Sequence, residues 1–331
     1  MTDAYARAGV SQGEADRAVA ALIEALGSAG TGAGRRVLAS GHYASVVAID
    51  DATGIAVTTD GVGTKLLVAE QLGRWDTVGI DCVAMNVNDV ICVGARPLAM
   101  VDYLAVDSAD AEVAGAIGAG LARGAELAGI EIVGGELAQL GDLIRGLDLA
   151  GACFGTVPLD GLVTGAAVEP GDAVIGLPSS GLHSNGYTLA RKALDGVPLD
   201  DDRLGRPLAD VLLEPTEIYV RPVLELRDSG VEVRGLAHIT SGGLGNLLRL
   251  EADVGYEIDS PLPVPPVFDL IAERGSVRLD DMHDVFNMGC GFCVVVAASD
   301  AEAALAILQR GYAGAARIGS VTDDPGRVVT G

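Results

Sequence analysis

The feature that most constrains the fold is an arrangement that occurs three times: a strand-like apolar run, a polar glycine-rich turn, and the spacing typical of a helix. The first copy runs from Ile55–Thr58 through Thr59–Lys65 (TDGVGTK) into Leu66–Leu72. Similar segments occupy Ala173–Tyr187 and Ala237–Leu250. Glycines let a backbone approach a ligand closely, and the free N–H groups of a helix N-terminus favour an anion. The three turns are therefore candidate ligand-binding loops.

Lys65 ends the first turn. It is one of only two lysines in the chain, the other being Lys192, beside 20 arginines. An ammonium group is a compact charge suited to a phosphate, and arginine does not replace it well. One interpretation is therefore a phosphate contact at Lys65. The other is an ordinary turn with a solvated lysine, and the local pattern leaves both open.

The chain of 331 residues is long enough for two domains and a large core. The turn-rich segment Val168–Asp172 predicts a division into residues 1–168 and 169–331. The net charge of −24 argues against nucleic acid as a partner, because nothing supplies a basic stripe. No run of about 18 residues is apolar enough to span a membrane. The N-terminal MTDAYARAGV lacks the regions of a secretory signal, so a cytoplasmic protein is expected.

A helix is predicted from Thr77 to Val93, with Asp76 as its cap. It is apolar nearly all round, which is typical of a buried helix. Asp81, Asn88 and Asp89 nevertheless share one of its faces. Buried carboxylates need a partner. A metal ion would serve, and so would helix-end capping together with a salt bridge to an arginine; the sequence leaves both open.

Other acids stand in or beside predicted strands. Asp60 lies in the first turn, Asp102 lies within the strand Pro97–Ala105, and Glu136 follows two glycines after the strand Ile130–Val133. Hard oxygen ligands at strand and helix ends suit Mg²⁺ held between carboxylates and phosphates. The first half of the chain therefore offers several candidate metal ligands.

The second turn, Ser179–Tyr187, places His183, Ser184 and Asn185 before a helix that starts at Thr188. Backbone N–H groups, hydroxyls and an imidazole would converge there, which suits a phosphate or a carbonyl, with His183 as an acid, base or hydrogen-bond donor. A capped helix with a surface histidine is the alternative. The pattern favours the functional interpretation.

The remaining cysteines and histidines are interpreted as structural. Cys290 and Cys293 have redox or zinc spacing, but they lie in an apolar strand-like run and no second pair exists. They are expected to be buried thiols. His42 and His283 lack supporting neighbours.

The N-terminal segment predicts a helix and a flexible stretch. Ser11 and Glu14 form a capping box, and apolar residues from Val19 to Leu26 share one helical face. The small-residue segment Gly27–Gly34 is either a lid over a nucleotide or a surface loop.

Taken together, the motifs resemble those of the phosphoribosylformylglycinamidine cyclo-ligase (AIR synthetase) family over nearly the whole chain. The matching segments, in order, are Tyr5–Val10, Thr59–Lys65, Gly79–Asp81, Asn88–Asp89, Asp102–Tyr103, Gly134–Glu136, Ser180–Tyr187, Pro215–Thr216, Ile218–Val220, His238–Thr240, Gly242–Gly243 and Phe286–Gly289. The pair DGVGTK and LHSNGY is the specific part of the resemblance.

The resemblance implies an α+β fold of two domains. In the N-terminal ATP-binding domain, residues 1–168, a mixed sheet would join that of a second copy in a dimeric barrel. The C-terminal domain, residues 169–331, would be an α/β sandwich-like unit. The implied enzyme is a ligase of purine biosynthesis that uses ATP and Mg²⁺ to close the ring of formylglycinamidine ribonucleotide, yielding 5-aminoimidazole ribonucleotide, ADP and phosphate. A cytoplasmic homodimer is implied.

The resemblance also implies roles by position. The implied catalytic residues are His183, Lys65 and Asp89. The implied metal ligands are Asp60, Asp89 and Glu136. The implied ATP or substrate contacts are Asp60, Gly61, Gly63, Thr64, Lys65, Asn88, Asp102, Gly135, Ser184, Asn185, His238 and Thr240.

The chain departs from the family pattern at Ala6, Leu137, Gln139 and Ser241, which puts details of ATP contact in question. The rival interpretations are sister ATP-dependent enzymes, such as selenophosphate synthetase or thiamine-monophosphate kinase, and a non-catalytic nucleotide-binding maturation scaffold. No cysteine precedes Cys82, where the selenium enzyme would carry a reactive one. The C-terminus, ending at Gly331, lacks the cysteine expected of such a scaffold.

Overall fold

The computed structural model describes residue 9 and residues 12–26, 34–38 and 41–331. The predictions for Tyr5, Ala6 and Ser11, and for the Gly27–Gly34 segment up to residue 33, lie outside the described residues. Helix α2 (Gln12–Leu26) forms where a helix is predicted. Its apolar side chains are exposed in the single chain, including Val19, Leu22, Ile23 and Leu26.

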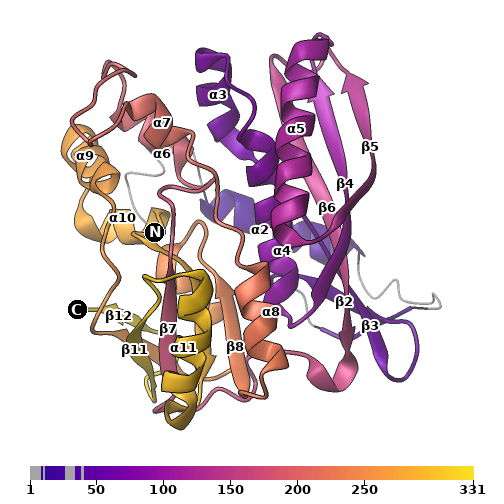
Figure 1. The fold of residues 1–331 in the computed structure, drawn as a ribbon, viewed down its shortest axis with the longest axis vertical. Helices are drawn as coiled ribbons and strands as arrows, with labels where there is room; N and C mark the ends of the chain where they lie inside the picture. The colour runs from indigo at the N-terminus through magenta and orange to yellow at the C-terminus, as the bar shows by residue number, and fades with distance from the viewer. Residues whose placement is uncertain (1–8, 10–11, 27–33, 39–40) are drawn as a thin grey trace.

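Six strands of the N-terminal half form one mixed sheet, sheet A, in the order β1-β2-β3-β6-β4-β5 (Figure 1). The strands are β1 (Arg35–Arg36), β2 (Ser45–Ala48), β3 (Thr53–Gly61), β4 (Arg96–Val106), β5 (Glu131–Gln139) and β6 (Leu147–Pro158). Among the described strands of sheet A, only β4 and β5 pair in parallel, and a helix connects them, as a parallel connection requires. Among the described strands, the edge strands β1 and β5 do not pair with each other. The predicted barrel is therefore not closed within one chain.

Helices cover one face of sheet A (Figure 1). They are α4 (Val78–Cys92) and α5 (Ala111–Ala128), preceded by the short 3-10 helix η1 (Gly63–Lys65) and α3 (Leu66–Leu72). A Cβ on Gly79 would lie 2.3 Å from the Leu121 nitrogen, so the close crossing of α4 and α5 requires glycine there. Asp110 caps α5 through two backbone N–H groups. The predicted cap at Asp76 is wrong, because α4 starts after Thr77 with no side-chain cap.

The other face of sheet A is open. Along β6, buried and half-exposed side chains alternate, because every second residue points away from the helices. The open face carries apolar side chains, among them Val57, Val101 and Tyr103, which are 42%, 38% and 41% exposed. Exposed apolar side chains on a sheet face make that face a candidate interaction surface.

The C-terminal half forms sheet B, in the order β12-β9-β11-β7-β10-β8 (Figure 1). Its strands are β7 (Ala173–Pro178), β8 (Val233–His238), β9 (Gly255–Ile258), β10 (Cys290–Val296), β11 (Ala316–Thr322) and β12 (Val328–Thr330). Its α-helices are α6 (Tyr187–Ala193), α7 (Leu208–Leu212), α8 (Val220–Asp228), α9 (Pro266–Gly275), α10 (Leu279–Val285) and α11 (Ala301–Gly311). Besides η1, the described residues form the 3-10 helices η2 (Leu159–Gly161), directly after β6, and η3 (Gly243–Arg249) and η4 (Ala298–Asp300) in the C-terminal half.

Helix α4 belongs to the cores of both halves. It packs against β3, β4 and β6 of sheet A and also contacts β8 and α8 of the C-terminal half. Residues of both halves therefore pack against this helix. The prediction that the helix is buried is confirmed, since most of its residues are inaccessible to solvent.

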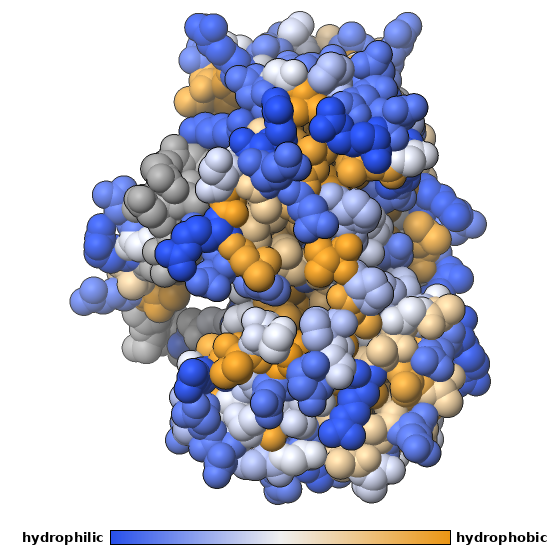
Figure 2. Space-filling view, turned by 90° about the vertical axis from the view of Figure 1, so that its left-hand side faces the viewer, coloured by the Kyte–Doolittle hydropathy of each residue, from blue (hydrophilic) through white to orange (hydrophobic). Residues whose placement is uncertain are grey.

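On the face shown in Figure 2, hydrophilic side chains predominate at both ends of the molecule, and hydrophobic ones show mainly across the middle. Of the helices in the described ranges, none combines the length and the hydrophobicity needed to cross a bilayer. Cys290 and Cys293 are buried free thiols on β10, as predicted, with their sulfur atoms 3.6 Å apart.

Candidate active site

Asp60 stands at the end of β3, held in place by the side chain of Asn86 on α4. Strand β2 pairs with β3 only as far as Val57, so the backbone of Asp60 has no partner on that side. The Asn86 amide accepts from the Asp60 N–H at 3.1 Å and donates to its carbonyl at 3.1 Å. A buried backbone must find such partners. Asn86 thereby fixes the position of the Asp60 carboxylate.

Asp89 and His238 meet across the two halves of the molecule. The Nδ1 atom of His238, at the end of β8, lies 2.9 Å from Oδ1 of Asp89 on α4. Since a carboxylate accepts, His238 donates its Nδ1–H. The other ring nitrogen, Nε2, is buried and has no hydrogen-bond partner among the described residues.

Asp60 and Asp89 form a pair of neighbouring carboxylates. Burial, followed by the charge of Asp89, raises the pKa of Asp60 from 3.8 to about 6. The N–H of Gly61, which donates to Asp60 at 2.7 Å, opposes that rise only in part. A pair of neighbouring carboxylates, of which Asp60 has a raised pKa, is a site at which a cation would be stabilised.

His183 lies in the Ser179–Tyr187 turn in a strained conformation. Its φ of 61° is in the left-handed region, which costs free energy for a residue other than glycine and is found mainly at functional sites. Burial lowers the pKa of His183 well below its ordinary value, so the imidazole is neutral. The Ser180 N–H donates to Nε2 at 3.3 Å. The proton therefore sits on Nδ1, which is buried without a partner among the described residues.

The neighbours of His183 also face other segments of the site. Ser184 and Thr216 lie with their hydroxyl oxygens 3.2 Å apart. The side-chain oxygen of Asn185 accepts from the Ser241 hydroxyl at 3.2 Å. Asn185 thus links the second turn to the third. Its side-chain nitrogen also lies 3.9 Å from the sulfur atom of Met85 on α4.

The third turn is organised by Asn246, whose side-chain oxygen accepts from the Thr240 N–H at 2.7 Å. Its amide nitrogen donates to the Ser241 carbonyl at 3.1 Å. In the first turn, Gly63 has a φ of 70°, and the Thr64 hydroxyl meets that of Thr188 at 3.1 Å. The first turn therefore contacts the helix that follows the second turn, and the second turn contacts the third.

The geometry does not support the predicted ligand contacts of Lys65 and Asn88. Lys65 is 0% exposed, and its ammonium lies 2.9 Å and 2.8 Å from the two Asp81 oxygens. Neither a phosphate contact nor a solvated lysine describes it, and the partner of Asp81 is this lysine rather than a metal or an arginine. Asn88 is also buried, and its amide binds the Glu217 carbonyl and the Tyr219 N–H of the other half. It joins the two halves.

Glu136 cannot join Asp60 and Asp89 around one metal within a single chain. Asp60, Gly151, Asp102 and Gly135 lie in one row across four strands, and Gly151 faces α4. Glu136 is one residue further along β5, so its side chain points to the open face. Within the described residues, no three His, Cys, Asp or Glu side chains gather around a metal position.

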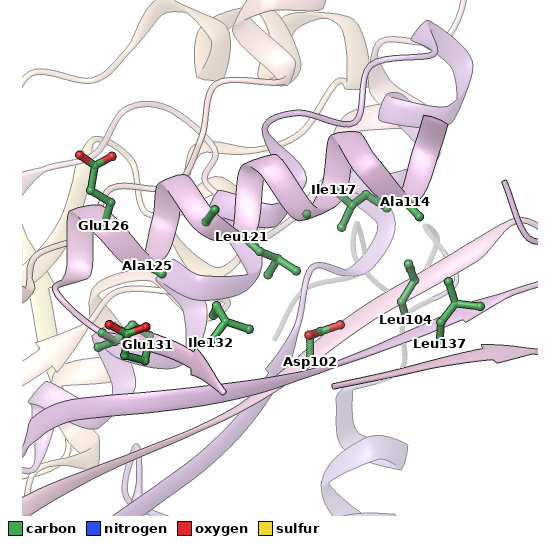
Figure 3. A pocket seen from close by; sticks show the side chains of 13 residues that line it. Asp102, Leu104, Ala114, Ile117, Leu121, Ala125, Glu126, Glu131, Ile132 and Leu137 are labelled. Carbon is green, nitrogen blue, oxygen red and sulfur yellow. The ribbon is translucent and has the colours of Figure 1, made fainter. Parts of the chain in front are cut away.

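Asp102 faces the helices but lines a separate pocket of about 600 Å³ between α5 and strands β4 and β5 (Figure 3). It is two strands from Asp60, roughly 10 Å. The side chains of Asn86 and Cys82 stand over Gly151 between them. A Cβ on Gly135 would lie 2.2 Å from the Asp102 carboxylate. Gly135 therefore makes room for Asp102, and neither residue reaches the Asp60–Asp89 pair.

The sequence interpretation missed Arg249, at the end of η3. Its charge acts on Asp60 and on His42. The guanidinium donates to the carbonyls of Gly41 and His42 at 3.2 Å and 3.0 Å and lies 4.0 Å from the centre of the Tyr43 ring. The chain has 20 arginines, and no local sequence pattern distinguishes Arg249 from the others. His42, interpreted from the sequence as structural, is close enough to Arg249 and Asp89 for their charges to act on it.

The donor set fits Mg²⁺ only in part. Asp60 and Asp89 supply hard oxygen ligands beside each other, and Mg²⁺ commonly binds one or two carboxylates together with phosphates and water. Glu136 does not fit, since it lies on the other face of the sheet.

This fold and this site define a class of protein. Residues 41–157 match the model of the AIR synthase related protein N-terminal domain, and residues 169–331 match that of the C-terminal domain. The chain therefore belongs to the AIR synthase related protein family.

Within that family, the relatives are phosphoribosylformylglycinamidine cyclo-ligases, and the chain belongs with them. It is 55% identical to the enzyme of that name from Methanothermobacter thermautotrophicus, over 87% of this chain and 85% of that one. It is 48% identical to that from Pyrococcus furiosus, over 98% and 97%. The family resemblance in the sequence is thus confirmed.

Solved structures share the fold. A HypE–HypF complex matches with a TM-score of 0.64 at 22% identity, over 87% of this chain and 89% of that one. A thiamine-monophosphate kinase from Stenotrophomonas maltophilia matches with a TM-score of 0.62 at 23% identity, over 89% and 90%. These likenesses bear out the predicted two-domain α+β architecture.

Proposed function

We propose that the protein is a cyclo-ligase that converts formylglycinamidine ribonucleotide and ATP into 5-aminoimidazole ribonucleotide, ADP and phosphate, in purine biosynthesis. The activity follows from the near full-length similarity to enzymes of that name. The observation that carries the site assignment is the convergence of the carboxylate pair Asp60–Asp89 with two imidazoles, each of which has one nitrogen without a partner among the described residues. Buried polar atoms without a partner need an explanation, and a bound ligand supplies it.

The reaction first activates the formyl oxygen as a phosphate ester, and a substrate nitrogen then attacks the formyl carbon as phosphate leaves. We assign Asp60 and Asp89 to a Mg²⁺ ion that would neutralise the phosphates of ATP. Lys65 is buried, so we assign the cationic contact with phosphate to Arg249, whose charge acts on Asp60. Charge stabilisation and positioning of this kind dominate phosphoryl transfer.

The two histidines have different roles in this proposal. His183 is neutral and carries its proton on Nδ1, so it donates a hydrogen bond to an oxygen of the substrate. His238 donates Nδ1–H to Asp89, which leaves the Nε2 lone pair to receive the proton of the attacking nitrogen. Ser184, Asn185 and Thr240 surround the substrate from the second and third turns.

We also propose that two copies meet through the open face of sheet A. That face carries exposed apolar side chains, and each of the edge strands β1 and β5 pairs on one side only among the described strands. Closure with a second sheet would bury the face and pair the edges. Glu136, which points to that side, then lies at the interface. We further propose the division at residue 168, between the two sheets, and a cytoplasmic location.

The test is an assay with formylglycinamidine ribonucleotide, ATP and Mg²⁺, in which the aminoimidazole product is detected by its aromatic-amine colour reaction. Product that requires both substrates and is lost in Asp89→Ala supports the reaction and the site together. The matched control is Asp76→Ala, since Asp76 is an exposed acid just before the same helix and its removal is expected to leave activity unchanged. Absence of product from folded wild-type protein would refute the proposal, and thiamine monophosphate would be the next substrate.

A further inference from the structure

The buried charge pair of Lys65 and Asp81 is not used by the reaction proposed above. Both side chains are 0% exposed. The ammonium also donates to the Glu214 carbonyl at 2.6 Å. Asp81 accepts in addition from the N–H of Thr216 at 2.8 Å and from its hydroxyl at 2.6 Å. A buried pair is costly unless its remaining groups are hydrogen-bonded, and here both partners have further bonds.

These contacts join the first turn to the second across the two halves of the molecule. Lys65 and Asp81 belong to the N-terminal half, and Thr216 belongs to the C-terminal half. The Thr216 hydroxyl oxygen lies 3.2 Å from that of Ser184, in the turn that contains His183. A continuous series of polar contacts therefore runs from Lys65 through Asp81 and Thr216 to Ser184.

The direction of this series follows from hydrogen-bond chemistry. A hydroxyl has one proton and two lone pairs. Thr216 gives its proton to Asp81, because a carboxylate accepts and charge-assisted bonds are the strong ones. Thr216 can then only accept from Ser184, so Ser184 is the donor of that bond. Ser184 has its proton engaged and keeps only lone pairs for a ligand.

We propose that Asp81 and Thr216 are positioning residues that orient the Ser184 hydroxyl as a hydrogen-bond acceptor, so that the site selects a substrate N–H or O–H group at that point. The inference rests on the proposed function, because it takes Ser184 to face the substrate. It adds a specificity rule: a ligand with only an acceptor at that position would leave two lone pairs facing each other. Such a mismatch in a buried site is strongly disfavoured.

The experiment compares Thr216→Val with Thr216→Ser. Valine has nearly the shape of threonine but no hydroxyl, whereas serine keeps the hydroxyl. We expect Thr216→Val to raise KM for formylglycinamidine ribonucleotide about tenfold and to leave KM for ATP within about threefold. Thr216→Ser is expected to restore KM for the ribonucleotide to near the wild-type value. A residue that only supports the fold would lower the melting temperature without this difference between the two KM values.

A double-mutant cycle with Ser184→Ala provides the second measurement. If Thr216 acts through Ser184, the double variant Thr216→Val/Ser184→Ala has the KM of Ser184→Ala alone. Independent roles would give additive effects. Additive effects, or a wild-type KM in Thr216→Val, would overturn the inference. Should Thr216→Val fail to fold, Thr216→Ala takes its place in both measurements, since alanine also lacks the hydroxyl. Failure of the proposed function is distinct, since the wild type would then form no product.

Discussion

Replacing Asp60 by asparagine is expected to stabilise the fold while it removes activity. Burial and the charge of Asp89 raise the pKa of Asp60 from 3.8 to about 6. At about 1.4 kcal/mol for each pH unit, the charged form costs the folded state about 3 kcal/mol at neutral pH. Asparagine carries no charge and still accepts from the Gly61 N–H. The variant should therefore gain most of that free energy.

The pH dependence has a definite sign. Between about pH 3.8 and pH 6, the folded protein keeps a proton on Asp60 that the unfolded chain has lost, so stability falls as the pH rises through this window. The full cost is present above about pH 6. The gain in Asp60→Asn should be about 3 kcal/mol at pH 8 and about half of that at pH 5. For a chain of this size, 3 kcal/mol corresponds to about 4 °C in melting temperature.

Thermal unfolding of wild type and variant without Mg²⁺, at pH 5 and pH 8, measures this difference. The exposed acid Asp51 provides the control, since Asp51→Asn should change stability by less than about 0.5 kcal/mol. Added Mg²⁺ should raise the melting temperature of the wild type more than that of Asp60→Asn, because a ligand stabilises the state that binds it. A gain equal at both pH values, or no gain, would refute the electrostatic argument.

Three further predictions follow from single contacts. Gly135→Ala should lower the free energy of unfolding by about 1–3 kcal/mol, because the new Cβ would lie 2.2 Å from the Asp102 carboxylate. The control Gly134→Ala should be neutral in thermal unfolding, because a Cβ there has nothing within 4 Å. Equal effects of the two variants would contradict this packing. Tyr103→Asp, on the open face of sheet A, should convert a dimer to a monomer in sedimentation velocity, while Tyr103→Phe should stay dimeric; a dimer in both would move the interface elsewhere. Arg249→Met should raise KM for ATP about tenfold, and Arg249→Lys should have a KM close to that of the wild type. A wild-type KM in Arg249→Met would refute the assignment of Arg249 to the phosphate.

Much of the fold is predictable from local pattern. The helix predicted from Thr77 to Val93 is α4 (Val78–Cys92), because its apolar residues and terminal glycine act locally. The strand predicted at the start of the Ala173–Tyr187 segment is β7 (Ala173–Pro178), an apolar run buried along nearly its whole length. The segment after Gly242 is a 3-10 helix, and β12 is not predicted. These short elements depend on tertiary contacts, which a local window does not contain.

The site is less predictable, because it depends on pairing between distant residues. The turn around Lys65 has the composition of a phosphate loop, but Asp81 and Thr216 lie far along the chain and decide where the ammonium goes. The face on which Glu136 lies depends on the register of β4 and β5, which shifts between Met100 and Val101. A shift by one residue moves every side chain to the opposite face. Because β5 contains glycines, its sequence lacks the alternation of polar and apolar residues from which the face of Glu136 could be predicted.

Helix α4 also has a consequence for folding during synthesis. All strands of sheet A lie between residues 35 and 158, so that sheet can assemble before the second half of the chain leaves the ribosome. The side chains of Asp81 and Asn88, however, bind Thr216, Glu217 and Tyr219. Until residue 219 emerges, these polar groups must remain hydrated at the surface of a partly folded nascent chain. Completion of the N-terminal core is therefore delayed until about two thirds of the protein has been translated.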